Sequence, residues 1–371
     1  MNETKSVRYH RLKRRSAVAS VAITAVLLGA LLVTGFSSVI ADGARRLANA
    51  TDSRYSAVAV TIYVTVLVFL QETLTFPLSL YQGFLLERRY GLSLERFGAW
   101  FGDHAKAVGL GLLLSVGAAQ VVYLSLWLAP TWWWLFSAAA FVLATAGLAM
   151  IAPVVLLPMF YRFTPLERES LRSRLVSLSA RAGVPVLGVY EWALGEKSRR
   201  ANAALVGTGG TRRIIISDTL LAEYSEDEIE VILAHEIGHH VHHDILVGFV
   251  AESILLLLAC YGAAIAQHGW GSRLGFVGDA DVAGLPLLLL VGGAVSMLAT
   301  PLVHALSRWN ERRADRYALT LTGHAAAFIS AMRRLGAQNL AEDDPSKIVQ
   351  WLFYSHPPVR DRIAAAQSFK H

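Results

Sequence analysis

The sequence has little cysteine and little charge. Its 371 residues include one cysteine, Cys260, so neither a disulfide framework nor a cysteine-rich zinc site can form within one chain. Charged residues make up 17% of the chain, hydrophobic residues make up 54%, and the mean hydropathy is +0.44. Internal repeats and low-complexity linkers are also absent from the sequence. This composition argues against a wholly soluble chain of two or three domains and is typical of a membrane protein.

Long apolar runs predict six membrane-spanning helices. They cover residues 17–41, 57–80, 105–129, 135–161, 245–267 and 282–306. The first run is longer than the roughly 7–15 apolar residues of a cleaved signal peptide, which predicts that it is retained as a membrane helix. Gln71 and Glu72 lie inside the second run, and we expect them to face the protein interior or water because both are costly in lipid.

The net charge of +6 is interpreted through membrane topology, and no nucleic-acid partner is predicted. Arginine and lysine are richer in segments 1–15, 82–104 and 162–244 than in the loops between them. The positive-inside rule then places both termini and segment 162–244 in the cytoplasm. The predicted organisation has four regions: membrane helices at 1–161, a cytoplasmic region at 162–244, two membrane helices at 245–306, and a helical C-terminal region at 307–371.

Segment 231–239 holds His-Glu-x-x-His in an apolar run without proline. On a helix, His235 and His239 lie one turn apart on one face, so both imidazoles can reach one zinc ion at about 2.0–2.1 Å. Zinc lowers the pKa of a bound water from about 15.7 to about 7, which makes Glu236 a competent base at neutral pH. Ser225 followed by Glu228 is a capping-box pattern that marks the start of this helix.

Glu311 is the predicted third metal ligand. Glu311 and Asp315 share one face of a predicted helix, and their repulsion is relieved if Glu311 binds a metal and Asp315 accepts a hydrogen bond from a ligand histidine. The alternative is a solvated charged helix in which neighbouring arginines pair with both acids. His243 is a competing ligand, but a straight helix does not bring it to the same ion as His235 and His239. His240, His242 and His243 are interpreted as solvent or headgroup histidines.

The polar region also contains local folding signals. Thr164-Pro165 and Gly183 bound a predicted amphipathic helix over residues 165–182. Residues 201–206 and 212–217 are predicted strands, joined by a glycine-rich turn. An exposed edge of such a strand could pair with an extended peptide and align it over the metal.

Several motifs in order, from about residue 80 to residue 363, resemble the zinc-dependent CAAX prenyl protease family, integral-membrane peptidases of the gluzincin type. The motifs are Tyr-Gln-Gly-Phe at 81–84, Phe-Thr-Pro-Leu at 163–166, Asn-Ala at 202–203, Ser-Asp-Thr-Leu-Leu at 217–221, His-Glu-Ile-Gly-His at 235–239, Glu-Arg-Arg-Ala-Asp at 311–315 and Ser-His-Pro-Pro at 355–358. The family usually has seven spans, whereas we predict six. The resemblance implies a mainly α fold, a polytopic helical membrane protein with a gluzincin-like peptidase domain and a small β-sheet.

The resemblance also implies a site and a function. It implies one Zn²⁺ per chain on His235, His239 and Glu311, with Glu236 as the base and Asp315 in support. Asn202 and Ala203 would hold the substrate backbone, and His356 would stabilise the oxyanion, although a loop histidine before a Pro-Pro turn is the simpler interpretation of His356. The expected activity is that of a zinc metalloendopeptidase in the lipid bilayer that cuts peptide or protein substrates near the C-terminus, the substrates being CAAX-type or related membrane-associated proteins, with their prenylation left open. The alternatives are a quality-control protease of the HtpX type and an inactive membrane scaffold.

Overall fold

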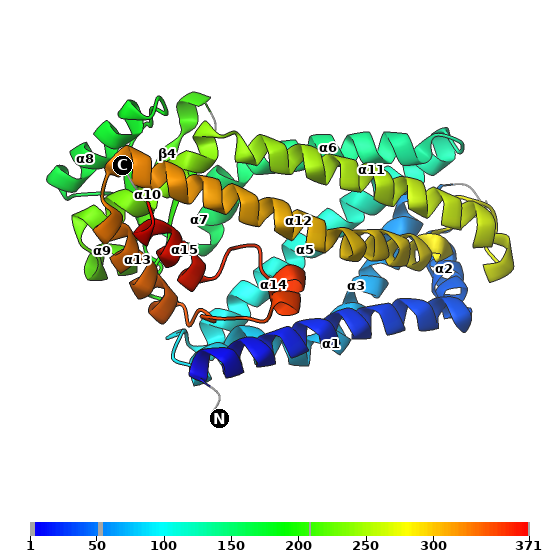
Figure 1. Ribbon diagram of the computed structural model, residues 1–371. Helices are drawn as coiled ribbons and strands as arrows, with labels where there is room; N and C mark the ends of the chain where they lie inside the picture. Colours follow the sequence, from blue (N-terminus) through cyan, green and yellow to red (C-terminus); the bar gives the residue numbers. More distant parts are fainter. Residues whose placement is uncertain (1–3, 51–54, 208, 370–371) are drawn as a thin grey trace.

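A computed structural model describes residues 4–50, 55–207 and 209–369 (Figure 1). Six helices in these ranges are long and apolar enough to cross a membrane. They are α1 (Lys5–Val33), α3 (Ala57–Leu80), α5 (Phe97–Leu128), α6 (Trp133–Ile151), α11 (Asp244–Trp270) and α12 (Leu285–Thr322). The predicted number of six spans therefore agrees with the structure, but several predicted boundaries are wrong.

The first predicted span is two helices. The backbone turns at Gly35, which has a left-handed φ of 70°, and the short helix α2 (Phe36–Leu47) follows α1. Glycine tolerates this conformation because it has no Cβ, so the apolar run 17–41 cannot continue as one rod. Segment 81–104 is expected from its sequence to be a loop with short helices, and the structure contains those helices: α3 continues through a π-helical turn at Tyr81–Leu85 into α4 (Leu86–Arg89), and α5 already begins at Phe97, before the predicted span.

The fourth and sixth spans also differ from the prediction. After α6, a π-helical turn at Ala152–Leu156 leads into α7 (Leu157–Phe160), and a proline lies near the start of each of these two segments. In the sixth span, α12 runs unbroken for 38 residues through Pro301, so the predicted helix around Glu311 is the end of the membrane helix itself. Short 3₁₀ turns at Ser272–Leu274 and Val282–Gly284 connect α11 to α12.

The six long helices form a closed ring. Packing runs from α1 to α3, α5, α6, α11 and α12 in turn, and α12 packs against α1. Polar side chains of the membrane helices pair with one another: Gln71 donates to Thr24 Oγ1 at 2.7 Å, and Glu72 Oε1 lies 2.7 Å from His104 Nε2.

A small domain covers one end of the ring. Its mixed sheet has the order β1–β2–β4–β3, formed by β1 (Phe163–Pro165), β2 (Val189–Trp192), β3 (Ala203–Val206) and β4 (Arg213–Ser217). A 3₁₀ turn at Gly209–Thr211 follows β3. The helices of this domain are α8 (Glu169–Arg181), α9 (Asp218–Glu223), α10 (Glu226–Val241), α13 (Ala325–Gln338), α14 (Lys347–Phe353) and α15 (Val359–Gln367). The predicted helix at 165–182 and both predicted strands correspond to α8, β3 and β4, but the predicted helix start is wrong, because Thr164 and Pro165 belong to β1 and α8 begins at Glu169.

One apolar core joins the central polar region to the C-terminal region. It runs from Leu166 to Ile237 in the first and from Ala318 to Ala366 in the second. Figure 1 shows the sheet, α10, α13, α15 and the N-terminal end of α1 at the same end of the molecule. Contacts between distant segments fix this arrangement, since Tyr9 donates to Glu87 at 2.6 Å and Arg200 bonds the same carboxylate at 2.9 Å.

Candidate metal centre

Helix α10 carries the His-Glu-x-x-His sequence. The Ser225 side chain accepts from the backbone N–H of Glu228, and the Glu228 side chain accepts from the backbone N–H of Ser225, so the predicted capping box is present. The helix is buried from Glu228 to His235. Their spacing of four residues on one helix brings His235 and His239 together, with their Nε2 atoms 3.2 Å apart.

Helix α12 brings Glu311 to the two histidines. Its Oε2 lies 3.3 Å from His235 Nε2, and its Oε1 lies 3.4 Å from His239 Nε2. Gly238 permits this approach, because a Cβ at that position would lie 3.1 Å from the Cα of Ala314 on α12. The candidate ligand atoms of His235, His239 and Glu311 all lie within 4.8 Å of one another.

The chemistry of this set fits a metal ion. Two imidazole nitrogens and one carboxylate are a donor set typical of catalytic zinc, in which a water molecule completes the coordination. The Oε2 atom of Glu311 is buried and has no hydrogen bond of good geometry among the described residues. A buried carboxylate oxygen in that situation is costly unless a cation binds it.

Each histidine has a carboxylate on its other ring nitrogen. His235 Nδ1 lies 2.8 Å from Asp315 Oδ1, and His239 Nδ1 lies 2.8 Å from Asp244 Oδ2. Asp315 in turn accepts from Arg362 Nε at 2.8 Å, and Asp244 pairs with Arg313. A carboxylate that accepts from Nδ1–H holds the tautomer whose Nε2 lone pair is free for a metal. Sequence analysis singled out Asp315 but missed Asp244 and Arg362, which no local pattern marks, and gave Arg313 no role at the centre although it lies in the motif at 311–315.

These contacts change the acidity of the site in the metal-free protein. Burial lowers the pKa of His235, but the carboxylates of Asp315 and Glu311 raise it more, to about 9. The pKa of His239 is also raised, because its bonds to Glu311 and Asp244 outweigh its burial. Burial raises the pKa of Glu236, and the neighbouring histidines oppose this only in part. A base with a raised pKa holds an abstracted proton more readily near neutral pH.

His356 lies at the same centre. Its Nε2 is 3.2 Å from Glu311 Oε1, and its side chain is 62% exposed, so the ring borders open space beside the ligands. Ser355 Oγ lies 2.9 Å from His356 Nδ1. The Pro-Pro sequence that follows leads into α15, which carries Arg362 to Asp315. The Ser-His-Pro-Pro turn therefore positions two side chains at the centre, whereas the sequence predicted one.

Strand β3 is an edge strand beside α10. Ala203 begins it, and the exposed residue Asn202 precedes it. The backbone N–H of Asn202 donates to Ser217 Oγ at 2.9 Å, and its carbonyl oxygen accepts from the backbone N–H of Ser217 at 2.9 Å. The backbone N–H and C=O groups of Asn202 point toward β4. Because these groups alternate along a strand, those of Ala203 and Leu205 point away from β4, toward the open edge of the sheet. His240 Nε2 lies 3.1 Å from the carbonyl oxygen of Leu205, so the interpretation of His240 as a solvent histidine is wrong.

The other two histidines of this cluster differ from each other. His242 is half-buried and packs edge-on against Tyr317. His243 is exposed, with a left-handed φ of 57° that ends α10 and begins α11. This break turns His243 away from the face of His235 and His239, which removes it as a third ligand.

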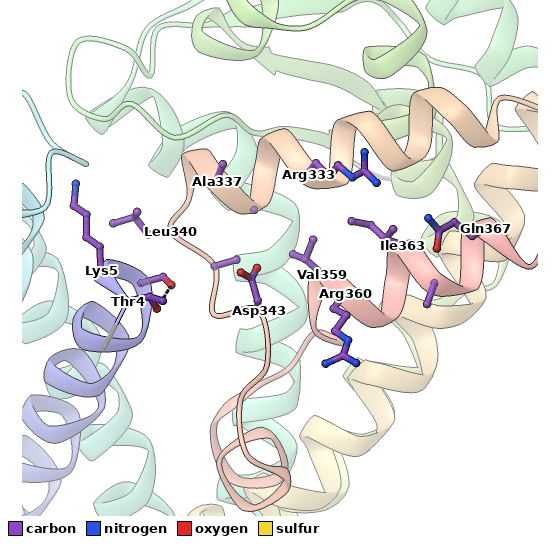
Figure 2. Close-up of a pocket in the computed structure, with 14 residues that line it drawn as sticks. Thr4, Lys5, Arg333, Ala337, Leu340, Asp343, Val359, Arg360, Ile363 and Gln367 are labelled. Atoms are coloured by element: carbon purple, nitrogen blue, oxygen red, sulfur yellow. Dashed lines mark hydrogen bonds between the residues drawn. The ribbon is translucent and has the colours of Figure 1, made fainter. Parts of the chain in front are cut away.

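Two other features lie outside this centre. Asp227, Glu230 and His324 also form a group with metal-ligand spacing, but Arg174 bridges both acids. The cavity in Figure 2, with a volume of about 830 Å³, lies between the start of α1 and helices α13 and α15. Its lining includes Lys5, Arg333 and Arg360 but none of the candidate ligands.

Comparisons with known proteins cover nearly the whole chain. Residues 165–370 match the model of peptidase family M48, and residues 2–162 match a model described as CAAX prenyl protease N-terminal, five membrane helices. Within that second range, the described residues contain four candidate spans and the short helix α2.

Individual relatives agree. The chain is 30% identical over 310 residues to the uncharacterized metalloprotease YhfN of Bacillus subtilis, covering 82% of this chain and 72% of that protein. It is 28% identical to the probable CAAX prenyl protease 1 of Schizosaccharomyces pombe, covering 85% and 68%. The crystal structure of S. mikatae Ste24p has the same fold, with a TM-score of 0.84 over 98% of this chain and 87% of that chain at 24% identity.

Proposed function

The chain belongs to peptidase family M48 and is an integral-membrane metalloprotease, and we propose that it binds one zinc ion through His235, His239 and Glu311. We propose further that it cleaves peptide bonds near the C-termini of membrane-associated proteins. The observation that carries the zinc assignment is the pair of carboxylates on the Nδ1 atoms of His235 and His239, together with the buried Oε2 of Glu311, which lies 3.3 Å from His235 Nε2.

Zinc bound at this centre would supply Lewis acidity to the scissile carbonyl and to water. Glu236 takes a proton from the attacking water and returns it to the leaving amine. The raised pKa of its half-buried carboxyl suits both transfers. Asp315 and Asp244 hold the ring orientations of His235 and His239 throughout.

His356 is proposed to donate a hydrogen bond to the oxygen on which negative charge develops. Three features support this role: the ring borders the ligands, it is exposed to the space that a substrate would enter, and the Pro-Pro turn fixes its backbone. Its distance to Glu311 is also too long for a strong ionic hydrogen bond, which leaves Nε2 available.

The substrate is proposed to extend β3 as an additional strand. The outward peptide groups of Ala203 offer a donor and an acceptor, while His240 already contacts the carbonyl oxygen of Leu205. Backbone pairing is therefore expected at Ala203 rather than further along the strand, and the exposed side chain of Asn202 is proposed as the second substrate contact. Strand addition selects for an extended peptide and places few demands on its side chains.

The substrate class and the orientation follow from the membrane setting. A relative of this chain is named a probable CAAX prenyl protease 1, and the ring of membrane helices lies directly beside the centre. We propose membrane-associated substrates with a CAAX-type, prenylated C-terminus. The basic segments 1–15, 82–104 and 162–244 all lie at the end of the ring that carries the centre, and the positive-inside rule places that end in the cytoplasm.

Matched peptides test this proposal. The purified protein in lipid nanodiscs is assayed with a farnesylated CAAX-type peptide, with the same peptide lacking the farnesyl group, and with the farnesylated cysteine moved to an internal position. Mass spectrometry locates the cut. We expect cleavage of the first peptide near its C-terminus and none by Glu236→Gln, which keeps its zinc. Equal cleavage of all three peptides would show a peptidase of broader, quality-control character. Absence of zinc after reconstitution would refute the metal assignment.

A further inference from the structure

Helix α14 (Lys347–Phe353) has an exposed apolar face. Ile348, Trp351 and Leu352 lie three and four residues apart, so they share one side of the helix. Their exposed fractions are 72%, 51% and 37%. No residue of this seven-residue helix is buried. A helix with so much exposed apolar surface is stable in place only if something apolar covers it.

The helix lies where two members of the ring separate. Figure 1 shows that α1 and α12 approach each other at the end far from the sheet and diverge toward the sheet, with α14 between them. On the α12 side, Arg308 donates to the carbonyl oxygens of Gln350 and Tyr354 at 3.1 and 2.6 Å. On the α1 side, Arg14 donates to Glu342 at 2.6 Å and to the hydroxyl of Tyr354 at 3.1 Å.

The hydrogen bonds from Arg308 and Arg14 fix the position of α14 along the membrane normal. On α1, Arg14 and Arg15 are the last basic residues before the apolar run that begins at Ala17. On α12, Arg308 comes directly after the apolar run that ends near Leu306. Both arginines therefore mark the boundary between the bilayer core and the polar phase, and α14 is held at that boundary.

The geometry points to α14 as a membrane-interfacial helix whose Ile348, Trp351 and Leu352 face enters the acyl-chain boundary of the bilayer between α1 and α12. Both neighbours also expose apolar side chains in their membrane spans, since Val18 on α1 and Leu302 on α12 are 53% and 71% exposed. Tryptophan prefers this depth, because its ring is amphipathic. The preceding residues Asp343 and Asp344 are exposed and keep the start of the segment in the polar phase.

Contact with the bilayer has a consequence for the metal centre. Tyr354, which ends α14 and accepts from Arg308, is two residues before His356. Arg308 is itself one turn before Glu311 on α12. The depth of α14 in the membrane therefore helps to position His356 relative to Glu311.

The single cysteine of the chain makes a direct test possible. In a Cys260→Ser background, Ile348→Cys and Trp351→Cys are each labelled with a polarity-sensitive fluorophore, and Asp344→Cys is the matched control. The full-length variants are studied in nanodiscs that carry nitroxide-labelled phospholipid, with the nitroxide either high on the acyl chain or at its end. Unchanged thermal unfolding of each labelled protein confirms its fold.

Probes at 348 and 351 are expected to show blue-shifted emission and to lose more intensity to the shallow nitroxide than to the deep one. The probe at 344 is expected to emit as in water and to be quenched by iodide. Two results would overturn the proposal. A water-like probe at 348 would place this face in the polar phase. A blue-shifted probe that neither nitroxide quenches would place it inside the ring or against another protein chain.

Discussion

Two variants at the ion pair of Asp315 and Arg362 distinguish an effect on metal binding from an effect on folding stability. The first removes the Asp315 carboxylate alone, and the second removes both charges. The Asp315 carboxylate bonds His235 Nδ1 at 2.8 Å, Arg362 Nε at 2.8 Å and Arg362 Nη2 at 2.5 Å. The side chains of His235, Asp315 and Arg362 are only 9%, 8% and 12% exposed. Loss of the carboxylate therefore affects a histidine and an arginine that have little access to water.

Asp315→Leu is expected to cost about 3 kcal/mol in the free energy of unfolding of the metal-free protein. Loss of one partner of a buried pair usually costs about 3–5 kcal/mol. We expect the lower end, because Glu311 Oε2 lies 3.9 Å from Arg362 and remains as a weaker counterion. The metal affinity should fall by about 10–100-fold, or about 1.4–2.7 kcal/mol, because His235 loses the acceptor that orients its ring.

The double variant Asp315→Leu/Arg362→Met is the decisive comparison. Removal of both charges should restore most of the folding stability, since an apolar pair can replace a buried ion pair at little cost. His235 still has no acceptor, so the metal affinity should stay low. Thermal unfolding after chelation measures the first quantity, and zinc competition with a chromophoric chelator measures the second. Recovery of metal affinity along with stability would refute the argument and would make Asp315 only a counterion for Arg362.

Four further changes have defined outcomes. His356→Ala should keep zinc and leave KM nearly unchanged while lowering kcat by about 10²–10³-fold, as for loss of one oxyanion donor, and steady-state kinetics with metal analysis measure this. Gly238→Ala should destabilise the protein by about 1–3 kcal/mol in thermal unfolding and weaken zinc binding, because the new Cβ meets the backbone of Ala314. Protonated His235 stabilises the metal-free protein below its unfolded pKa of about 6.5, and this stability is lost as pH rises through about 9. Zinc must displace that proton, so its apparent affinity, measured by titration across this range, should rise by at least about tenfold per pH unit and level off above pH 9, and the slope should be steeper where His239, whose pKa is also raised, is protonated too. Reporter fusions at residue 15, within 82–104, near 200 and at the C-terminus should report cytoplasm, and a fusion near 275 the opposite side; a reversed result for residue 15 alone would contradict the six-span topology.

The sequence predicted the helical membrane fold because apolar runs report helices that must satisfy their own hydrogen bonds in lipid. It could not predict where those helices end. Helix α5 begins at Phe97 and α12 ends at Thr322, well outside the apolar runs, because helical hydrogen bonding continues into the polar phase wherever packing supports it. Conversely, Gly35 ends α1 inside an apolar run, and hydropathy does not register a backbone turn.

The ligand candidates were predictable for a different reason. The spacing of His235 and His239 encodes their proximity, and Glu311 was found from the like-charge pair it forms with Asp315 on one helix face. Arg362 and Asp244 reach the centre only through tertiary packing, by α15 returning after the Pro-Pro turn and by α11 starting at a left-handed residue. No spacing rule in the sequence relates these residues to the histidines. His240 was misread because its acceptor, the carbonyl of Leu205, is backbone and carries no sequence signal.

The unbroken α12 gives the metal centre a mechanical property. Ten residues separate Pro301, within the bilayer span, from Glu311, a rise of about 15 Å along a stiff rod. His235 and His239 belong to α10. The left-handed residue His243 changes the chain direction between α10 and the membrane helix α11, so the two helices do not form one continuous helix. A bound ion would therefore link the membrane helix α12 directly to the domain outside the bilayer. A change of bilayer thickness that tilts α12 would move Glu311 relative to His235 and His239. Metal retention should therefore vary with the length of the lipid chains around the protein.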